Sequence, residues 1–506
     1  MTAIGNQQGA APMPAEPIWP FDNSYARLPE RFFARVRPTP VAQPGLVRLN
    51  EPLAEALGLE VAALRGKAGL AMFAGNRLPE GAEPIALAYA GHQFGQWVPQ
   101  LGDGRAVLLG EVVDRDGRRR DIQLKGSGIT PFSRGGDGRA PIGPVVREYL
   151  ASEAMHALGI PTTRSLAAVT TGEPVLRERV EPGGILTRVA HSHVRVGTFE
   201  YFHWREDVDA LRTLADYVIA RHYPELADDA RPHLALLKAV IDRTAELVAH
   251  WISVGFIHGV MNTDNTSLVG ETLDYGPFGF LDAYHPRTCY SAIDIENRYA
   301  FDQQPRIAHW NLTRLAETLL PLLHEDEDEA VARAGEALNG FLPRFEACHH
   351  ARLRAKLGLA ESRRGDIDLA HELLDLMARQ QADFTQVFRA LSDERMDDPD
   401  EGPARRCFAR PEALDGWRAR WIQRLRQEGR PEPARQAAMR AVNPKFILRN
   451  HLAQWAVDAA TERGDFGPMD RLLQVLTRPY DPQPEAEALA APPRPEQQVY
   501  QTFCGT

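Results

Sequence analysis

The sequence predicts an α+β protein with two lobes, a β-rich lobe that comes first and a larger, mainly helical lobe that follows. Residues 87–124 combine apolar runs with turn signals, which is typical of strands joined by tight turns. From about residue 204 onward the apolar residues recur with helical spacing, and a strand-rich insert, residues 258–284, interrupts the helices. At 506 residues the chain is too long for one simple core, so we expect two or three packed lobes.

Composition restricts the classes of function. The net charge of −10 argues against a general basic surface for nucleic acid, so any phosphate binding must come from a local cluster of Arg and Lys. No run of about 18 apolar residues occurs, and we expect no membrane span. The four cysteines form no C-x-x-C pair, which argues against zinc and fits a reduced, cytoplasmic setting.

The chain divides into four predicted parts. Residues 1–19 are rich in Gln, Gly, Ala and Pro and do not resemble a signal peptide, so we interpret them as a flexible leader. Residues 20–204 form the β-rich lobe with phosphate-binding loops, and residues 205–477 form the mainly helical lobe with the insert. Residues 478–506, rich in Pro, Glu and Ala, are interpreted as an extended tail.

A β-hairpin is predicted in the first lobe. Ala106–Val113 is an apolar run rich in β-branched residues, and Asp121–Lys125 alternates in polarity like a half-buried strand. The Asp-Gly turn signal lies between them, in Arg115–Arg118. A glycine-rich loop, Gly126–Gly143, then leaves the end of the second strand.

Helices and short strands follow this loop. A helix is predicted over Pro144–Leu158, because proline suits a first helical turn and Gly159 begins a stop signal. Short strands are expected over Ala167–Thr170 and Gly184–Ala190. Later helical or amphipathic segments are Val208–His222, Pro232–Val254, Ala360–Leu391 and Pro444–Arg463. This order is the layout of the protein kinase fold, and layout alone does not identify a function.

Features on two neighbouring strands are suited to phosphate binding. Gly102 and Gly104 would let the backbone approach a ligand, and Arg105 adds positive charge. Lys125 ends the next strand. A plain hairpin turn and a solvated lysine are the simpler interpretations of each feature alone, but their place on adjacent strands favours a phosphate loop and its lysine.

More arginines and glycines follow. Residues 133–139, which include Asp137 and Gly138, contain two Arg and three Gly and resemble an anion-binding nest, with a mobile loop as the alternative. Arg188 and Arg195 are either surface charges or bidentate ligands of a polyphosphate.

The strongest motif is His258–Asn265, which follows a long helix. Asn265 and Asp274 stand at opposite ends of a short predicted hairpin and can converge on one magnesium ion, as the metal-binding Asn and Asp do in kinases. The kinase catalytic Asp would fall at Val260, which can neither orient nor deprotonate a hydroxyl. Asp264 is the nearest carboxylate that could replace the kinase catalytic Asp. The alternative is that Asp264 is only a turn-capping residue. We therefore do not expect an ordinary protein kinase.

Together these motifs resemble the selenoprotein O family, also called the YdiU family, which are protein adenylyltransferases with a pseudokinase fold. The resemblance covers about residues 20–506. Its matching segments are Gly91-His92-Gln93-Phe94-Gly95, Leu101-Gly102-Asp103-Gly104-Arg105, Gln123-Leu124-Lys125-Gly126, Arg134-Gly135-Gly136-Asp137-Gly138-Arg139, Arg147-Glu148-Tyr149-Leu150, His258-Gly259-Val260-Met261-Asn262-Thr263-Asp264-Asn265, Asp274-Tyr275-Gly276-Pro277-Phe278-Gly279, Asn443-Pro444 and Leu448-Arg449-Asn450.

The resemblance implies that the loops of the β-rich lobe bind ATP. The nucleotide would bind in the opposite orientation to that in kinases, so that its α-phosphate faces the acceptor. The residues implied to bind ATP are Gly102, Gly104, Arg105, Lys125, Asp137, Gly138, Arg188, Arg195 and Asp274. Asn265 and Asp274 would hold magnesium or manganese, and Asp264 would accept a proton.

Two arguments give different partners for Lys125. The family match implies that Glu148 pairs with Lys125, as the glutamate of the corresponding helix pairs with the lysine in kinases. On the predicted helix, however, Glu153 lies within the apolar face and Glu148 lies nearly opposite. A bend, or a helix buried on two sides, would reconcile them.

The resemblance implies transfer of AMP from ATP to Ser, Thr or Tyr hydroxyls of protein substrates, with release of pyrophosphate. UMP transfer, an atypical kinase activity and a non-catalytic nucleotide-binding scaffold are the alternatives. Val260 argues against phosphoryl transfer, and the retained metal ligands argue against a scaffold.

Cys504 stands third from the end, where some family members carry selenocysteine. Cys289, fifteen residues after Asp274, is its expected partner in a disulfide that would pin the tail over the site and restrict substrate entry. A free thiol without regulatory meaning is the alternative.

Overall fold

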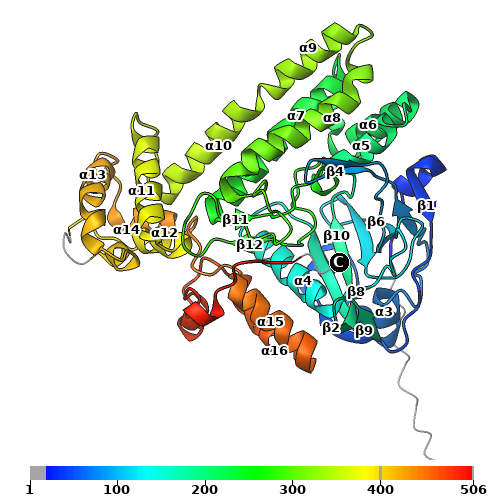
Figure 1. The fold of residues 1–506 in the computed structure, drawn as a ribbon, viewed down its shortest axis with the longest axis horizontal. Helices are drawn as coiled ribbons and strands as arrows, with labels where there is room; N and C mark the ends of the chain where they lie inside the picture. Colours follow the sequence, from blue (N-terminus) through cyan, green and yellow to red (C-terminus); the bar gives the residue numbers. More distant parts are fainter. Residues whose placement is uncertain (1–18, 398–401, 504–506) are drawn as a thin grey trace, which may run out of the picture.

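The computed structural model describes residues 19–397 and 402–503, and it confirms the mixed α+β class (Figure 1). These residues form an eight-stranded sheet in the order β1-β3-β6-β7-β10-β9-β2, with β8 paired to β10. The strands are β1 (Phe33–Arg35), β2 (Gly45–Leu49), β3 (Ile85–Leu87), β4 (Gly91–Gln93), β5 (Gln96–Val98), β6 (Ala106–Val113), β7 (Arg119–Lys125), β8 (Ala140–Pro141), β9 (Arg164–Leu176), β10 (Val180–Ala190), β11 (Phe256–Ile257) and β12 (Gly279–Phe280). The α-helices are α1 (Glu51–Ala56), α2 (Val61–Arg65), α3 (Lys67–Phe73), α4 (Ile142–Ala157), α5 (Val196–His203), α6 (Val208–His222), α7 (Pro232–Val254), α8 (Gln304–Leu323), α9 (Glu327–Leu338), α10 (Phe341–Lys356), α11 (Asp366–Gln380), α12 (Phe384–Ser392), α13 (Asp415–Arg426), α14 (Glu432–Arg440), α15 (Asn450–Arg463) and α16 (Gly467–Leu476).

The predicted hairpin is confirmed as β6 and β7, at the centre of the sheet. Side chains of β6 alternate between two cores, as the period of a strand requires. Val107 and Leu109 pack in the core that contains residues of α1 and α3, whereas Leu108 packs in the core that contains α4. The sheet is therefore covered on both faces.

Helix α4 begins two residues before the predicted start and is buried along almost its whole length. The sheet covers one side of it, and α15 and α16 contact another. The helix is thus buried on two sides, which explains why Glu148 and Glu153 can lie on different faces and both be buried.

The two strands predicted after α4 are longer than expected. They form the hairpin of β9 and β10, which extends to Leu176 and Val180 at its tip. The prediction stopped early because Gly172 and the prolines near the tip interrupt the apolar run. Gly172 has a φ of 71°, and the register shifts between Pro182 and Gly184. These irregularities let the pairing of β9 with β10 continue beyond both residues to the tip of the hairpin.

The helices α6 and α7 have the predicted bounds. The amphipathic segment 360–391 is two helices, because the chain turns at Gln381 in a left-handed conformation and Asp383 caps α12. In the segment 444–463 the helix begins only at Asn450.

The expectation of a strand-rich insert was wrong. Its strands β11 and β12 are two residues each, and between them lie the 3-10 turn Thr263–Asn265 and isolated bridges. The antiparallel bridge between Thr266 and Thr272 lies within the hairpin predicted between Asn265 and Asp274. Side chains take the place of a strand ladder: His258 Nε2 donates to the carbonyl oxygen of Leu273 at 3.1 Å, and Asn265 Nδ2 donates to that of Val260 at 3.1 Å.

The late family segment anchors this insert. Asn450 accepts from the backbone N–H of Phe280 and donates to its carbonyl oxygen, each at 3.1 Å. The buried Arg449 guanidinium forms ion pairs with Asp282 at 2.6 Å and with Asp383 at 2.8 Å. These contacts join β12, α12 and α15.

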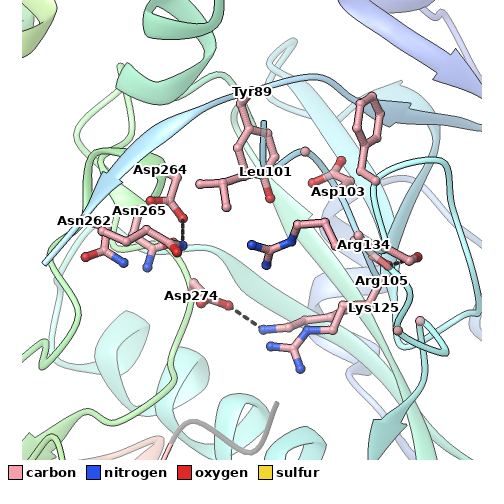
Figure 2. A pocket seen from close by; sticks show the side chains of 18 of the residues that line it. Tyr89, Leu101, Asp103, Arg105, Lys125, Arg134, Asn262, Asp264, Asn265 and Asp274 are labelled. Carbon is pink, nitrogen blue, oxygen red and sulfur yellow. Dashed lines mark hydrogen bonds and ion pairs between the residues drawn. The ribbon is translucent and has the colours of Figure 1, made fainter. Parts of the chain in front are cut away.

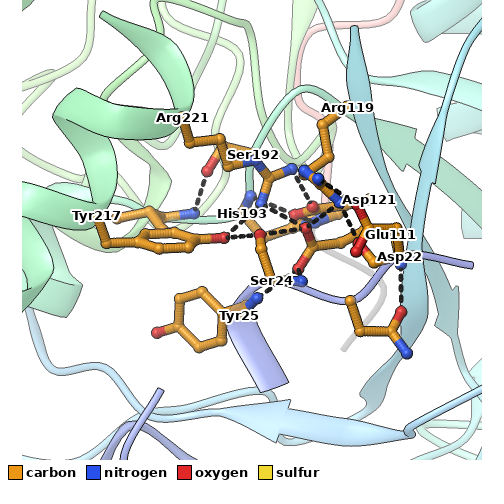
Figure 3. Close-up of polar contacts among 12 residues, drawn as sticks. Asp22, Ser24, Tyr25, Glu111, Arg119, Asp121, Ser192, His193, Tyr217 and Arg221 are labelled. Atoms are coloured by element: carbon orange, nitrogen blue, oxygen red, sulfur yellow. Dashed lines mark hydrogen bonds and ion pairs between the residues drawn. The ribbon is translucent and has the colours of Figure 1, made fainter. Parts of the chain in front are cut away.

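A second buried polar network joins the β6–β7 hairpin to α6 (Figure 3). Arg221 of α6 pairs with Asp121 at 2.5 Å and with Glu111 at 3.4 Å. Asp121 also accepts from the backbone N–H of His193 at 2.8 Å. The network therefore fixes the chain that leads from β10 to Arg195.

The described part of the tail is more ordered than the predicted extended chain. It contains the 3-10 helices Pro484–Leu489 and Pro495–Gln497, and Leu489 is buried. Its end returns to the insert, where Thr502 pairs with Ser291. In the residues described here, no helix has both the length and the apolar character needed to cross a bilayer.

Arg449→Met should lower the free energy of unfolding by about 3 kcal/mol, because two largely buried carboxylates would lose their cation. Arg463→Met is the matched control, since the ion pair of Arg463 with Glu462 is exposed and such pairs contribute about 1 kcal/mol or less. Urea denaturation followed by circular dichroism measures both. Equal unfolding midpoints for the two variants would contradict the anchoring role of Arg449.

Candidate active site

A cavity of about 730 Å³ lies between the sheet and the insert. Figure 2 shows Asn262, Asp264 and Asn265 on one side of it, Arg105, Lys125 and Arg134 on the other, and Asp274 between the two groups. Of the predicted site residues, those that line the cavity are Gly102, Gly104, Arg105, Lys125, Asp137, Gly138, Arg188, Arg195, Asp264, Asn265 and Asp274. Glu148 lies behind the lining and contacts it through Lys125.

The cavity is basic although the protein as a whole is acidic. Its lining includes seven cationic side chains, those of Arg105, Lys125, Arg134, Arg139, Arg177, Arg188 and Arg195. It includes four carboxylates, those of Asp103, Asp137, Asp264 and Asp274. A local excess of cations in a chain of net charge −10 is the cluster that phosphate binding requires.

Two glycines of the predicted phosphate loops are required by the backbone. Gly102 has a φ of 71°, and a Cβ there would lie 2.3 Å from the ring of Phe132. Gly138 has a φ of 64°, and its Cβ would lie 2.0 Å from the carbonyl oxygen of Gly128. Both loops therefore approach the cavity in conformations that a larger residue cannot adopt.

Lys125, Glu148, Arg188 and Asp274 form one ion-pair network beside the cavity. Lys125 Nζ lies 2.6 Å from Glu148 Oε2 and 2.5 Å from Asp274 Oδ1. Arg188 donates to Glu148 Oε1 through Nε at 2.8 Å and Nη2 at 2.5 Å, and to Asp274 Oδ1 at 3.2 Å. The sheet, α4 and the insert thus meet at these four charges.

The structure pairs Lys125 with Glu148, and the expectation of Glu153 from the helix face was wrong. Glu153 instead accepts from Arg164 at 2.8 and 2.6 Å and from Asn50 at 2.7 Å. The apolar face of α4 was a poor guide because both sides of the helix are buried.

The network also controls the charge of Asp274. Burial alone would raise the pKa of this carboxyl, but Lys125 and Arg188 outweigh burial and hold the pKa well below its usual range. Asp274 has a φ of 68°, which is uncommon for a residue with a side chain. Its ion pairs therefore hold both the charge and the strained backbone in place.

Asp264 has the opposite environment. Burial raises the pKa of its carboxyl to about 7, against the opposing effects of a hydrogen bond from Gln93 and the charge of Arg195. Oδ2 accepts from Gln93 Nε2 at 3.2 Å, and the buried Oδ1 has no hydrogen-bond partner among the described residues. The 3-10 turn has no side-chain cap, so Asp264 is not the turn-capping residue of the simpler interpretation.

Arg188 and Arg195 are buried, and the alternative of surface charges was wrong. Arg195 lies over the ring of Tyr89 at 4.3 Å and donates to the backbone carbonyl of Asp264 at 3.1 Å. Its Nη2 has no hydrogen-bond partner among the described residues. Arg195 therefore holds the Asp264 segment, and its Nη2 lies 3.9 Å from Asp103 Oδ1.

Sequence reasoning missed the role of the β4–β5 hairpin. Gln93 contacts Asp264, the N–H of His92 donates to Thr263 Oγ1 at 2.7 Å, and the N–H of Phe94 donates to Asn262 Oδ1 at 3.0 Å. The family segment Gly91–Gly95 contained the signal, but nothing local in it indicated a partner in the distant insert.

Two arginines hold segments in and beside the cavity. Asp137 forms a two-pronged ion pair with Arg177, at 2.9 and 3.0 Å, which holds the tip of the β9–β10 hairpin against the glycine-rich loop. Arg147 of α4 donates to the carbonyl of Phe278 at 2.6 Å and lies over its ring. Both arginines position cavity segments, and sequence reasoning assigned neither a role.

The donor set suits a hard divalent cation. Asn265 uses its amide nitrogen on Val260, which leaves its oxygen available, and Asp274 supplies a carboxylate oxygen. Magnesium takes a few such oxygens and completes its shell with water and phosphate. Among the described residues no group of three or more His, Cys, Asp or Glu is arranged to hold a metal ion.

Cys504 lies outside the described residues. Cys289 is half-buried, and its thiol donates to Asp294 Oδ2 at 3.3 Å. Burial and the Asp294 charge raise the pKa of Cys289 to about 12, which disfavours the thiolate that disulfide formation needs. The Cys289–Cys504 disulfide stays a prediction.

Comparison with known proteins agrees with the resemblance in the motifs. Residues 19–477 match the family model described as protein adenylyltransferase SelO. The chain is 60% identical over 488 residues to the protein nucleotidyltransferase YdiU of Rhodopseudomonas palustris, covering 96% of this chain and 99% of the relative. The YdiU proteins of Bradyrhizobium sp. and Methylorubrum populi are 61% and 60% identical, over 96% and 97% of this chain and 99% of each relative. This chain therefore belongs to the SelO family of protein adenylyltransferases.

Proposed function

We propose that this chain transfers AMP from ATP to Ser, Thr or Tyr hydroxyls of protein substrates and releases pyrophosphate. The observation that carries this proposal is the pairing, in one cavity, of a basic cluster with a buried carboxylate that has a raised pKa and a free oxygen. The cluster suits the phosphates of a nucleotide, and the carboxylate suits a hydroxyl that must lose its proton.

Asp264 acts as the proton acceptor in this proposal. The acceptor oxygen forms a bond to the α-phosphorus, its proton passes to the Asp264 carboxylate, and the bond from the α-phosphorus to the bridging oxygen breaks as pyrophosphate leaves. A pKa near 7 suits a general base at neutral pH. Gln93 donates to Oδ2 and so orients the carboxyl group of Asp264.

The basic residues neutralise the nucleotide. Lys125, Arg188 and Arg195 bind phosphate oxygens, and the loops of Gly102 and Gly138 bring backbone N–H groups close to them. Asn265 and Asp274 would hold magnesium or manganese, which supplies charge neutralisation on the phosphates when bound. Glu148 is a positioning residue, because it holds both Lys125 and Arg188.

We further propose that residues 20–204 and 205–477 are the two lobes of a kinase-like fold with this cavity between them. Val260, at the place of the kinase catalytic Asp, lines the cavity without any acid–base group. This favours nucleotidyl over phosphoryl transfer, and the flipped nucleotide of the family would bring its α-phosphate toward Asp264.

Protein incubated with magnesium and ATP should incorporate label from the α-phosphorus and not from the γ-phosphorus. The reason is that attack at the α-phosphorus leaves AMP on the acceptor. Scintillation counting of precipitated protein measures both, and an α-labelled UTP arm tests UMP transfer. Label from the γ-phosphorus would show a kinase, and label from neither nucleotide would show a scaffold.

Asp274→Asn should reduce α-label incorporation by a factor on the order of 1000, because the metal loses its carboxylate and Lys125 loses a partner. Thermal unfolding of the variant confirms that it is folded. Asp302→Asn, a change on the exposed partner of Arg287, is the control and should keep wild-type activity. A folded Asp274→Asn protein with wild-type transfer would exclude this metal site.

Glu148→Gln should lower the transfer rate by a factor on the order of 100, because two cations of the site lose the charge that positions them. Glu153→Gln on the same helix removes an equally buried charge from Arg164 and Asn50, so it should reduce stability and leave the rate per folded molecule nearly unchanged. Initial rates corrected for the folded fraction compare the two. Equal losses would indicate that α4 has only a structural role.

A further inference from the structure

The most exposed apolar side chains belong to segments that border the cavity. Among the large hydrophobic residues that the structure describes, the five with the highest exposed fractions are Ile295 (91%), Leu176 (71%), Tyr500 (70%), Phe503 (69%) and Val180 (68%). They come from only three segments of the chain. Single exposed apolar residues are ordinary, but a contiguous group usually marks an interaction site.

One group is at the tip of the β9–β10 hairpin, and we call it the hairpin lip. Leu176 and Val180 are directly opposite each other in the strand register, and Leu176 lines the cavity. The ion pair between Arg177 and Asp137 ties this tip to the glycine-rich loop. The hairpin lip is therefore held in place beside the phosphate-binding part of the site.

The other group, which we call the tail lip, consists of Ile293, Ile295, Tyr500 and Phe503. Thr502 joins its two segments, since its N–H donates to the carbonyl of Tyr290 at 2.7 Å and its carbonyl accepts from Ala292 at 3.1 Å. Thr502 Oγ1 also donates to the carbonyl of Pro277 at 2.8 Å, close in sequence to Asp274. The tail lip is thus fixed to the metal-binding insert.

The two lips border the same cavity, because Leu176 of one and Ile293 of the other both line it. Asp264 lies inside and is buried. A serine or threonine hydroxyl is attached directly to Cβ, so it can reach Asp264 only if the backbone that carries it enters the mouth. The residues beside the acceptor must then contact the lips.

We propose that the two lips bind an extended segment of the acceptor protein, with bulky apolar residues on both sides of the acceptor hydroxyl. This inference rests on the proposed AMP transfer. The phosphates occupy the basic interior, and the apolar rim recognises the acceptor chain. Specificity then comes from residues next to the hydroxyl rather than from a distant docking surface.

The test uses the double variant Val180→Ser/Ile295→Ser, because these two side chains belong to the lips but not to the cavity lining. The matched control is Val331→Ser/Leu342→Ser, which removes two exposed apolar side chains of α9 and α10. The acceptors are synthetic peptides with one Ser, Thr or Tyr, flanked by Leu and Ile in one set and by Gln and Gly in the other. Incorporation of α-label gives kcat/KM, and binding of a non-hydrolysable ATP analogue is measured for every variant.

The wild-type and control proteins should prefer the apolar set by about tenfold, and the lip variant should lose this preference through a higher KM with unchanged nucleotide affinity. An equal preference in the lip variant, or no preference in the wild type, would overturn the inference. Transfer to whole proteins without transfer to either peptide set would also overturn it. If the proposed AMP transfer itself were wrong, no α-label would enter either proteins or peptides, which distinguishes that outcome from a failure of the lip proposal alone.

Discussion

The ion-pair network of Lys125, Glu148, Arg188 and Asp274 is the interaction on which the rest of the site depends. Each charge is largely buried, so none is stable there without the others. The network joins two strands of the sheet, helix α4 and the irregular insert. Because the insert has almost no ladder of its own, these ion pairs decide where Asp274 lies.

The helical and C-terminal parts of the chain serve the same insert. Arg449 and Asn450 hold β12 and the residue pair after it, and Thr502 pairs with Ser291 in the segment that follows. Arg147 holds the turn after Asp274 from the opposite side. An insert with little regular structure is thus fixed by long-range contacts from α4, α15 and the tail, so that rigid elements support the segment to which we assign the metal ligands.

Local patterns predicted the elements that depend on local physics. The β6–β7 hairpin and the helices α6 and α7 follow from alternation and helical spacing, and the structure confirms them. The residues that line the cavity were also placed together by their motifs. The insert was mistaken for strands because side-chain hydrogen bonds such as those of His258 and Asn265 replace a ladder there. These partners are distant in sequence and leave no periodic signal.

The partner of Lys125 shows a second limit. Helical periodicity assumes one buried face, and α4 is buried against the sheet on one side and against α15 and α16 on another. The family motif identified Glu148 where periodicity favoured Glu153. In the same way, no sequence pattern connected Gln93 to Asp264, because the β4–β5 hairpin and the insert meet only in the folded chain.

The central claim is that the cavity orients a nucleotide with its α-phosphate toward Asp264 and its remaining phosphates toward Lys125 and Arg188. A crystal structure of the complex with magnesium and an ATP analogue that cannot be cleaved between the α- and β-phosphates tests this most directly. The account predicts the α-phosphorus facing Asp264, with the metal bound by Asn265 and Asp274. A γ-phosphate facing Asp264, with the α-phosphate beside Lys125, would contradict it.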